Sequence, residues 1–318
     1  MKKFKRSGLI TALCPLFLLA GDPIDKYTTM YLDEIVKLRH QIHEFPELGN
    51  REYNTAELVA SHLRESGLDV KTEIAFTGVL GVLKGGKPGP VVAVRADMDA
   101  LPVTENTDLP FKSIIRTVYN DVDVGVMHAC GHDGHSTMLL GAAIYLKKNN
   151  DFSGTVHFIF QPAEEGGGGG RVMVEEGIFD KFPCQAVYGM HNFPGIAEGQ
   201  FAVHDKAVMA ANETLNISIK GKGGHAAMPD KCIDPIVVGA QIISALQSVV
   251  ARNVAPLNSA VVSITMVNAG TVSNVVPDDM QLTGSLRYFS KEVGDEVKEK
   301  IKNIVEGVSQ SMGASATF

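Results

Sequence analysis

The chain has 318 residues, of which 45% are hydrophobic and 20% charged, a composition typical of a folded globular protein long enough for two domains. The formal net charge is -7, and no basic stripe with interleaved aromatic residues is present, so nucleic acid is excluded as an expected partner. The four cysteines are too few and too scattered for a disulfide framework.

The N-terminus has the layout of a secretory leader. Basic residues at positions 2, 3, 5 and 6 precede an apolar run over residues 9–20, which is too short to span a bilayer. We therefore expect a leader at residues 1–21 and a periplasmic or secreted protein without a stable membrane span. A cytoplasmic protein that keeps this segment is the alternative, because the residues before the cleavage point are not small.

Two helices are expected after this segment. Apolar residues recur at helical spacing over residues 32–45 and stop at Pro46. A second helix is expected to begin near Asn54, with Glu57 as its partner in a capping box, and to end at Gly67.

Short apolar runs then alternate with loops and with a helix expected over residues 136–148. The runs predict buried strands at residues 79–83, 91–94, 156–160 and 186–188. Continuous apolar strands indicate a sheet that is covered on both faces. The pattern predicts an α/β domain over residues 27–206, with a mixed, largely parallel sheet covered by helices.

The rhythm changes in the last third of the chain. A strand–helix–strand–strand–helix order is expected, at residues 213–220, 234–252, 260–267, 280–288 and 291–312, with a further strand beginning at Ala314. This order predicts an α+β domain of ferredoxin-like type over residues 207–318. Because that last strand has hardly begun at Phe318, we expect the C-terminal part of the α/β domain to be missing from this chain.

A run of glycines occupies residues 166–170. The run lacks the Gly-Lys-Ser/Thr ending of a phosphate loop and the spacing of a dinucleotide fingerprint. We interpret it as a flexible turn that lets the backbone approach a metal or a substrate, with a plain loop as the alternative.

Possible metal ligands are most concentrated in residues 127–135. This stretch holds a thiol, three imidazoles and a carboxylate, at His128, Cys130, His132, Asp133 and His135. Such a mixture of sulfur, nitrogen and oxygen ligands indicates a transition metal. The alternative is a turn with incidental histidines.

Adjacent glutamates, Glu164 and Glu165, follow the strand expected at 156–160. Neighbouring side chains of extended backbone point in opposite directions, so one carboxylate can bind a metal while the other faces water or the substrate. Hydrolysis of an amide at neutral pH needs an activated water and a proton for the leaving amine, which a metal ion and a nearby carboxylate supply together. Two solvated glutamates are the alternative.

Two further strand ends carry polar residues. Asp97 and Asp99 follow the strand at 91–94 and could orient ligating histidines, or could simply pair with Arg95. His191 follows the strand at 186–188. Three strand ends and the stretch 127–135 thus carry possible ligands, which incidental placement explains badly.

The second domain offers three more candidates. His225 lies in a glycine-rich turn, where a lone histidine is more often inert, and Asn274 is unremarkable by itself. Arg287 carries a planar guanidinium, which is well suited to hold a substrate carboxylate.

Taken together, five ordered motifs resemble the aminoacylase and carboxypeptidase-G-like metallopeptidase family, and within it the hippurate hydrolases and indole-3-acetyl-amino-acid hydrolases. The motifs are Arg95-Ala-Asp-Met-Asp-Ala-Leu-Pro102, His128-Ala-Cys-Gly-His-Asp-Gly-His135, Gln161-Pro-Ala-Glu-Glu165, Gly189-Met-His-Asn192 and the Gly-Gly-His-Ala-Ala-Met-Pro turn at residues 223–229. The resemblance runs from about Leu38 to the last residue.

The resemblance implies roles for these residues. It implies that a pair of divalent metal ions, manganese or zinc, is bound by Cys130, His132, Glu165 and His191. It implies that Glu164 is the general base, that Asp97 and Asp99 support the ligands, and that Asn274 and Arg287 hold the substrate carboxylate. It further implies a homodimer formed through the second domain as a lid, with His225 stabilising the oxyanion in the partner subunit's site.

The resemblance also implies an activity, the metal-dependent hydrolysis of N-acyl amino acids to a carboxylic acid and a free amino acid. Relatives supply one more histidine ligand after the lid, and no residue follows Phe318 here to do so. A truncated, catalytically impaired remnant is therefore one alternative. A related dipeptidase or N-acyl-diaminopimelate deacylase is another.

Overall fold

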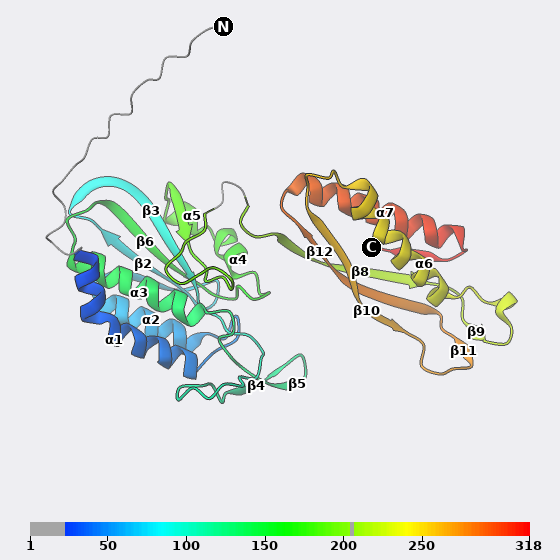
Figure 1. Ribbon diagram of the computed structural model, residues 1–318, viewed down its shortest axis with the longest axis horizontal. Coiled ribbons are helices and arrows are strands. Elements are labelled where there is room, and N and C mark those ends of the chain that lie inside the picture. The colour runs from blue at the N-terminus through cyan, green and yellow to red at the C-terminus, as the bar shows by residue number, and fades with distance from the viewer. Residues whose placement is uncertain (1–22, 204–206) are drawn as a thin grey trace, which may run out of the picture. The chain divides into compact units, whose positions relative to one another are not determined.

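The computed structural model describes residues 23–203 and 207–318, and the chain divides into two compact units, Met1–Gly195 and Ile196–Phe318 (Figure 1). Each unit has its own hydrophobic core. The leader expected at residues 1–21 lies outside the described residues. The second unit begins before the boundary expected at residue 207, and its first strand starts at Ala211.

The helices of the first unit are α1 (Pro23–Glu44), α2 (Tyr53–Glu65), α3 (His132–Lys148), α4 (Gly169–Glu175) and α5 (Ile178–Lys181). Its central sheet has five strands: β1 (Asp69–Ile74), β2 (Gly78–Lys84), β3 (Lys87–Asp97), β6 (Ser153–Gln161) and β7 (Ala186–Gly189). A separate hairpin is formed by β4 (Arg116–Tyr119) and β5 (Val122–Gly125).

The strand order in the sheet is β1-β2-β6-β3-β7. β3 runs parallel to β6 and β7, whereas β2 runs antiparallel to both β1 and β6. The predicted mixed, largely parallel sheet is confirmed, because β1, β6, β3 and β7 run in one direction and β2 alone runs in the other. Strand β1 escaped prediction because four of its six residues are exposed, so it contains no continuous apolar run.

Helices cover both faces of this sheet (Figure 1). Phe158 and Phe160 of β6 pack on one face with Leu63 of α2 and Leu140 of α3. The residue between them points to the opposite face, because side chains alternate along a strand, and Ile159 accordingly packs against α4 and α5. The sheet is thereby fixed between two helical layers, and its strand ends are held rigidly.

The predicted start of the first helix and the predicted cap of the second were wrong. α1 begins at Pro23 rather than near residue 32, because its first turns are mostly exposed and leave no apolar period to detect. The N-cap of α2 is Glu52 rather than Asn54, whose side chain instead donates a hydrogen bond of 2.8 Å to Glu47. Glu47 takes over the capping role, because its carboxylate accepts the backbone N–H groups of Asn54 and Thr55.

The second unit alternates strands and helices: β8 (Ala211–Lys220), α6 (Pro235–Ser248), β10 (Ala260–Ala269), β12 (Asp279–Tyr288), α7 (Lys291–Ser311) and β13 (Ser315–Thr317). The sheet order β10-β12-β8-β13 is antiparallel throughout, which is the ferredoxin-like arrangement. The short strands β9 (Gly224–His225) and β11 (Val275–Val276) pair separately, and η1 (Pro229–Lys231) is a single 3-10 turn.

One described helical segment, Pro235–Asn253, is long and apolar enough by composition to cross a membrane. It comprises α6 and the π-helical turn η2 (Val249–Asn253). Its residues Val238, Ile242 and Leu246 are fully buried against the sheet and α7, as in the core helix of a globular domain. Length and composition alone are therefore weak grounds for a membrane span.

Candidate metal centre

Three neighbouring parallel strands bring polar side chains to one edge of the first unit's sheet. β3, β6 and β7 end there, and the chain that completes or follows them carries the predicted site residues Asp97, Asp99, Glu164, Glu165 and His191. Helix α3 begins at His132 and adds its first turn to the same place. The carboxyl ends of parallel strands meet at one edge, which is why residues far apart in sequence converge here.

His132 is completely buried and oriented by Asp99. Its Nδ1 lies 2.8 Å from the carbonyl oxygen of Asp99, so Nδ1 carries the proton and donates it. The lone pair is then on Nε2, which lies 3.9 Å from Oε1 of Glu165 and 4.0 Å from Oε2 of Glu164. Asp99 therefore fixes the tautomer in which a histidine can bind a metal through Nε2.

Cys130 and His191 form the other half of the cluster. The sulfur of Cys130 lies 3.3 Å from Nε2 of His191. Nδ1 of His191 donates to the backbone carbonyl of Asn192 over 2.6 Å, so this imidazole, too, presents Nε2. The structure thus brings all four predicted ligands to one place.

The donor atoms of this cluster are suited to a metal ion. Nε2 of His132 and Oε1 of Glu165 are buried and lack a hydrogen-bond partner in the described structure, which is costly unless another group binds them. The ligand atoms of Cys130, His132 and Glu165 all lie within 4.8 Å of one another. A divalent cation fits these residues, because a thiolate, an imidazole and a carboxylate are its usual ligands.

Asp97, His135 and Asn192 form a hydrogen-bonded chain beside the cluster. Nδ1 of His135 donates to Asp97 over 2.6 Å, and Nε2 accepts the backbone N–H of Asn192 over 3.1 Å. Asp97 also pairs with Arg95, at 2.7 Å, as the alternative interpretation expected. Burial by itself would raise the pKa of Asp97, but the hydrogen bond from His135 and the charges of His132 and Arg95 lower it to about 2.

His135 and Asn192 were not predicted as site residues, although both lie inside the motifs. The ring nitrogens of His135 both have protein partners, unlike Nε2 of His132, so His135 connects two loops through hydrogen bonds. Sequence spacing cannot distinguish these two histidines. A second group of atoms within 4.8 Å of one another comes from Asp97, His132, His135 and His191. His128 is buried as well, but it belongs to neither this group nor that of Cys130, His132 and Glu165.

The electrostatics of the cluster favour protons on Cys130 and Glu164, among others. Burial and the neighbouring carboxylate of Glu165 raise the pKa of the Cys130 thiol to about 12. Burial and the charge of Glu165 also raise the pKa of Glu164, which is still 41% exposed. A cation bound here would favour the deprotonated forms of both.

Gly131, the N-cap of α3, is required where it stands. Its φ is 91°, and a Cβ added there would lie 2.4 Å from Oδ1 of Asn192. We expect Gly131→Ala to destabilise the protein by about 1–3 kcal/mol, from backbone strain together with the clash. Gly134→Ala is the matched control on the same helix, because a Cβ there meets no atom within 4 Å. Thermal unfolding of both variants measures the difference, and equal stabilities would contradict the argument.

In the second unit, two of the three predicted residues lie together. His225 on β9 pairs with Val275 on β11, and Ala226 donates its N–H to the carbonyl of Asn274 over 3.0 Å. Arg287 is distant from these two residues. Asp279, at the start of β12, closely follows β11, and Arg287 lies about 27 Å further along the same strand. His225 is exposed, and its Nδ1 accepts the N–H of Ala227 over 3.1 Å, which leaves the proton on Nε2.

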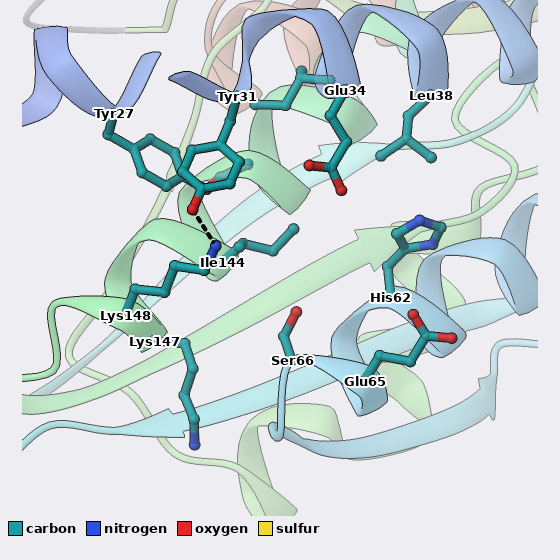
Figure 2. Close-up of a pocket in the computed structure, with 12 residues that line it drawn as sticks. Tyr27, Tyr31, Glu34, Leu38, His62, Glu65, Ser66, Ile144, Lys147 and Lys148 are labelled. Carbon is teal, nitrogen blue, oxygen red and sulfur yellow. Dashed lines mark hydrogen bonds between the residues drawn. The ribbon is translucent and has the colours of Figure 1, made fainter. Parts of the chain in front are cut away.

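A cavity of about 250 Å³ between α1, α2 and α3 contains none of the site residues (Figure 2). Lys148 crosses it to bond the hydroxyl of Tyr31 over 2.6 Å, Lys147 bonds the carbonyl of Gly67, and Tyr27 bonds that of Gly141. Its polar groups are largely engaged with the protein itself. We therefore interpret it as a groove in helix packing rather than as a substrate site.

A thiol, two imidazoles and carboxylates that converge at the carboxyl edge of parallel strands, with unpartnered atoms among them, define a metal-dependent hydrolase. The chain belongs to peptidase family M20/M25/M40, and the sequence profile of this family matches residues 93–314. This confirms the family resemblance inferred from the five motifs.

The chain is similar to named members of this family. It is 48% identical to the hippurate hydrolase of Campylobacter jejuni, over 87% of this chain and 70% of that protein. It is 42% identical to IAA-amino acid hydrolase ILR1-like 2 of Arabidopsis thaliana, over 86% of this chain and 60% of that protein. A crystal structure of a dinuclear metal-binding peptidase from Bacillus subtilis is 38% identical, with a TM-score of 0.76 over 91% of this chain and 73% of that one.

Proposed function

We propose that this protein hydrolyses the amide bond of N-acyl amino acids, hippurate-like or indole-3-acetyl-amino-acid-like, to a carboxylic acid and a free amino acid. The observation that carries the proposal is the pair of unpartnered buried atoms, Nε2 of His132 and Oε1 of Glu165, beside the exposed carboxylate of Glu164. The names of the similar hippurate and IAA-amino acid hydrolases support this substrate class.

Cys130, His132, Glu165 and His191 would hold two divalent ions, manganese or zinc, with the thiolate favouring zinc. When bound, such ions polarise the amide carbonyl and lower the pKa of a water molecule. Glu164 would serve as the general base, taking a proton from the attacking water and passing it to the leaving amine nitrogen.

A panel of substrates tests the proposed function. Purified protein, reconstituted with Mn²⁺ or Zn²⁺, is assayed for amino-acid release from hippurate, indole-3-acetyl-alanine, a plain dipeptide and N-succinyl-diaminopimelate. Preference for the first two compounds supports the proposal. Preference for the dipeptide or the diaminopimelate conjugate would replace it, and bound metal without any turnover would favour the impaired remnant.

We further propose that the second unit is a lid through which the protein forms a homodimer, that His225 stabilises the oxyanion, and that Asn274 and Arg287 bind the substrate carboxylate. The protonated, exposed Nε2 of His225 supports this, since it is a free hydrogen-bond donor. Arg287 lies far from His225 and Asn274 along the fold, as expected if two subunits contribute residues to one active site. Sedimentation of the intact chain measures the oligomeric state.

His225→Ala is expected to lower kcat by about 100-fold and to change KM little, because loss of one oxyanion donor acts mainly on the transition state. Lys222→Ala is the matched control, since Lys222 is an exposed residue of the same turn. Steady-state kinetics on the preferred N-acyl amino acid give both constants. A rise in KM at constant kcat would show that His225 binds the ground state instead.

A further inference from the structure

The turn that carries the two glutamates is strained. Ala163, fully buried between β6 and Glu164, has a φ of 48°, a conformation that L-residues other than asparagine and aspartate rarely adopt. Holding such a residue costs about 1–3 kcal/mol unless its surroundings impose the conformation. The direction in which Glu164 and Glu165 leave the strand therefore depends on what holds Ala163.

The glycine run closes this turn from one side. A Cβ at Gly169 would lie 1.9 Å from the carbonyl oxygen of Pro162, and one at Gly167 would lie 2.5 Å from the Cβ of Ala163. Gly169 also donates its N–H to the carbonyl of Ala163 over 3.1 Å. The run thus lets the backbone approach the turn itself.

Glu52 holds the turn from the opposite side. Its side chain is fully buried, and Oε1 accepts the backbone N–H of Ala163 over 2.7 Å. Oε2 accepts the hydroxyl of Thr77 over 2.6 Å. Burial raises the pKa of Glu52, so this group is expensive to keep in place.

Glu52 is available for this contact because another residue caps its helix. It stands at the N-cap of α2, where an acidic side chain ordinarily accepts N–H groups of the first turn, yet it makes no such bond. Glu47 accepts the N–H groups of Asn54 and Thr55 instead. Glu52 is thereby directed out of its helix toward Ala163.

We propose that Glu52 is a positioning residue, which fixes the Ala163 turn through one hydrogen bond and so aims Glu164 and Glu165. Asp99 completes the clamp, because its Oδ2 accepts the N–H of Glu165 over 2.8 Å. The two accepted N–H groups flank Glu164, the general base of the proposed function on which this inference rests. Glu52 lies outside every motif that indicated the site.

Three variants test the proposal. Glu52→Leu removes the acceptor at similar volume, whereas Glu52→Gln keeps an oxygen for Ala163 and offers its amide N–H₂ to the Thr77 hydroxyl. Thr77→Val, the matched control, removes the other hydrogen bond of Glu52 from the same buried place and leaves the acceptor of Ala163 intact. All three are assayed with the reconstituted full chain.

We expect Glu52→Leu to lower kcat by about 100-fold with little change in KM, as misplacement of a reacting group by about 1 Å can do. Glu52→Gln and Thr77→Val should keep kcat close to that of the wild type. Equal losses in Glu52→Leu and Glu52→Gln, or an equal loss in Thr77→Val, would overturn the proposal, because the effect would then follow charge or general stability.

Hydrogen exchange at the Ala163 amide gives a readout that does not require turnover. Glu52→Leu should expose this amide to exchange, and Glu52→Gln should leave it protected. Unchanged protection in Glu52→Leu would also overturn the proposal. If the wild type is inactive toward every N-acyl amino acid while the exchange result holds, the proposed function fails and the positioning contact stands.

Discussion

Glu164→Gln is expected to lower kcat by about 10²–10⁴-fold, the usual contribution of a general base, and to leave metal binding intact. Glu164 is 41% exposed at the edge of the cluster, and Oε2 lies 4.0 Å from Nε2 of His132. Glu164 does not belong to the groups of residues whose ligand atoms converge. A glutamine at this position should therefore leave the metal ligands unchanged. Glutamine keeps the volume and polarity of the side chain but cannot take a proton from water.

Turnover of the preferred N-acyl amino acid and metal content by mass spectrometry are measured together. Glu165→Gln is the matched control, because Glu165 lies on the same turn. This substitution likewise replaces one carboxylate oxygen by an amide nitrogen. Oε1 of Glu165 belongs to the ligand cluster, so this variant should lose metal as well as activity. Near-normal rates in Glu164→Gln would remove it as the base, and metal loss in that variant would make it a ligand.

The sequence predicted the composition of the site because its residues obey a simple rule of α/β sheets. β3, β6 and β7 are parallel neighbours, so whatever follows them meets at one edge. Continuous apolar runs revealed β3 and β6, and the polar residues directly after them stood out. The convergence of Cys130, His132, Glu165 and His191 follows from that geometry.

Glu52 could not be found in this way. Its partner Ala163 lies 111 positions away, and the contact is a side chain bonded to a backbone N–H, which leaves no trace in residue type or spacing. The expected capping box at Asn54 did not point to Glu52 either. Glu47, rather than Asn54, accepts the backbone N–H groups at the start of α2, and this leaves the Glu52 side chain free for Ala163. Contacts of this kind depend on packing rather than on periodicity.

The positive φ of Ala163 was equally hidden. Alanine is an unlikely residue for the left-handed region, so the sequence gives no warning of a strained turn beside the predicted base. The neighbouring glycine run was visible, but the approach it permits could be identified only from the distances to Pro162 and Ala163. Strain at this point is consistent with a functional turn that the surrounding structure holds in place.

Cys130→Ser is expected to weaken metal binding by more than the roughly 10–100-fold that is lost when only a supporting residue is changed. Serine is nearly isosteric, but its hydroxyl stays protonated at neutral pH and is a harder, weaker ligand than a thiolate. The Cys130 sulfur lies 3.3 Å from Nε2 of His191, so a serine hydroxyl there can still donate to this imidazole while the sulfur ligand is lost. Activity should fall with metal content and recover only partly in excess metal.

Cys184→Ser is the matched control, since Cys184 is also a free, part-buried cysteine of the first unit but lies outside the ligand cluster. Cobalt substitution separates the two variants, because a thiolate-to-cobalt charge-transfer band requires a sulfur ligand. We expect this band in the wild type and in Cys184→Ser and its loss in Cys130→Ser, with affinities taken from competition against a chelator. A band that survives in Cys130→Ser, with unchanged affinity, would show that the sulfur at this position binds no metal.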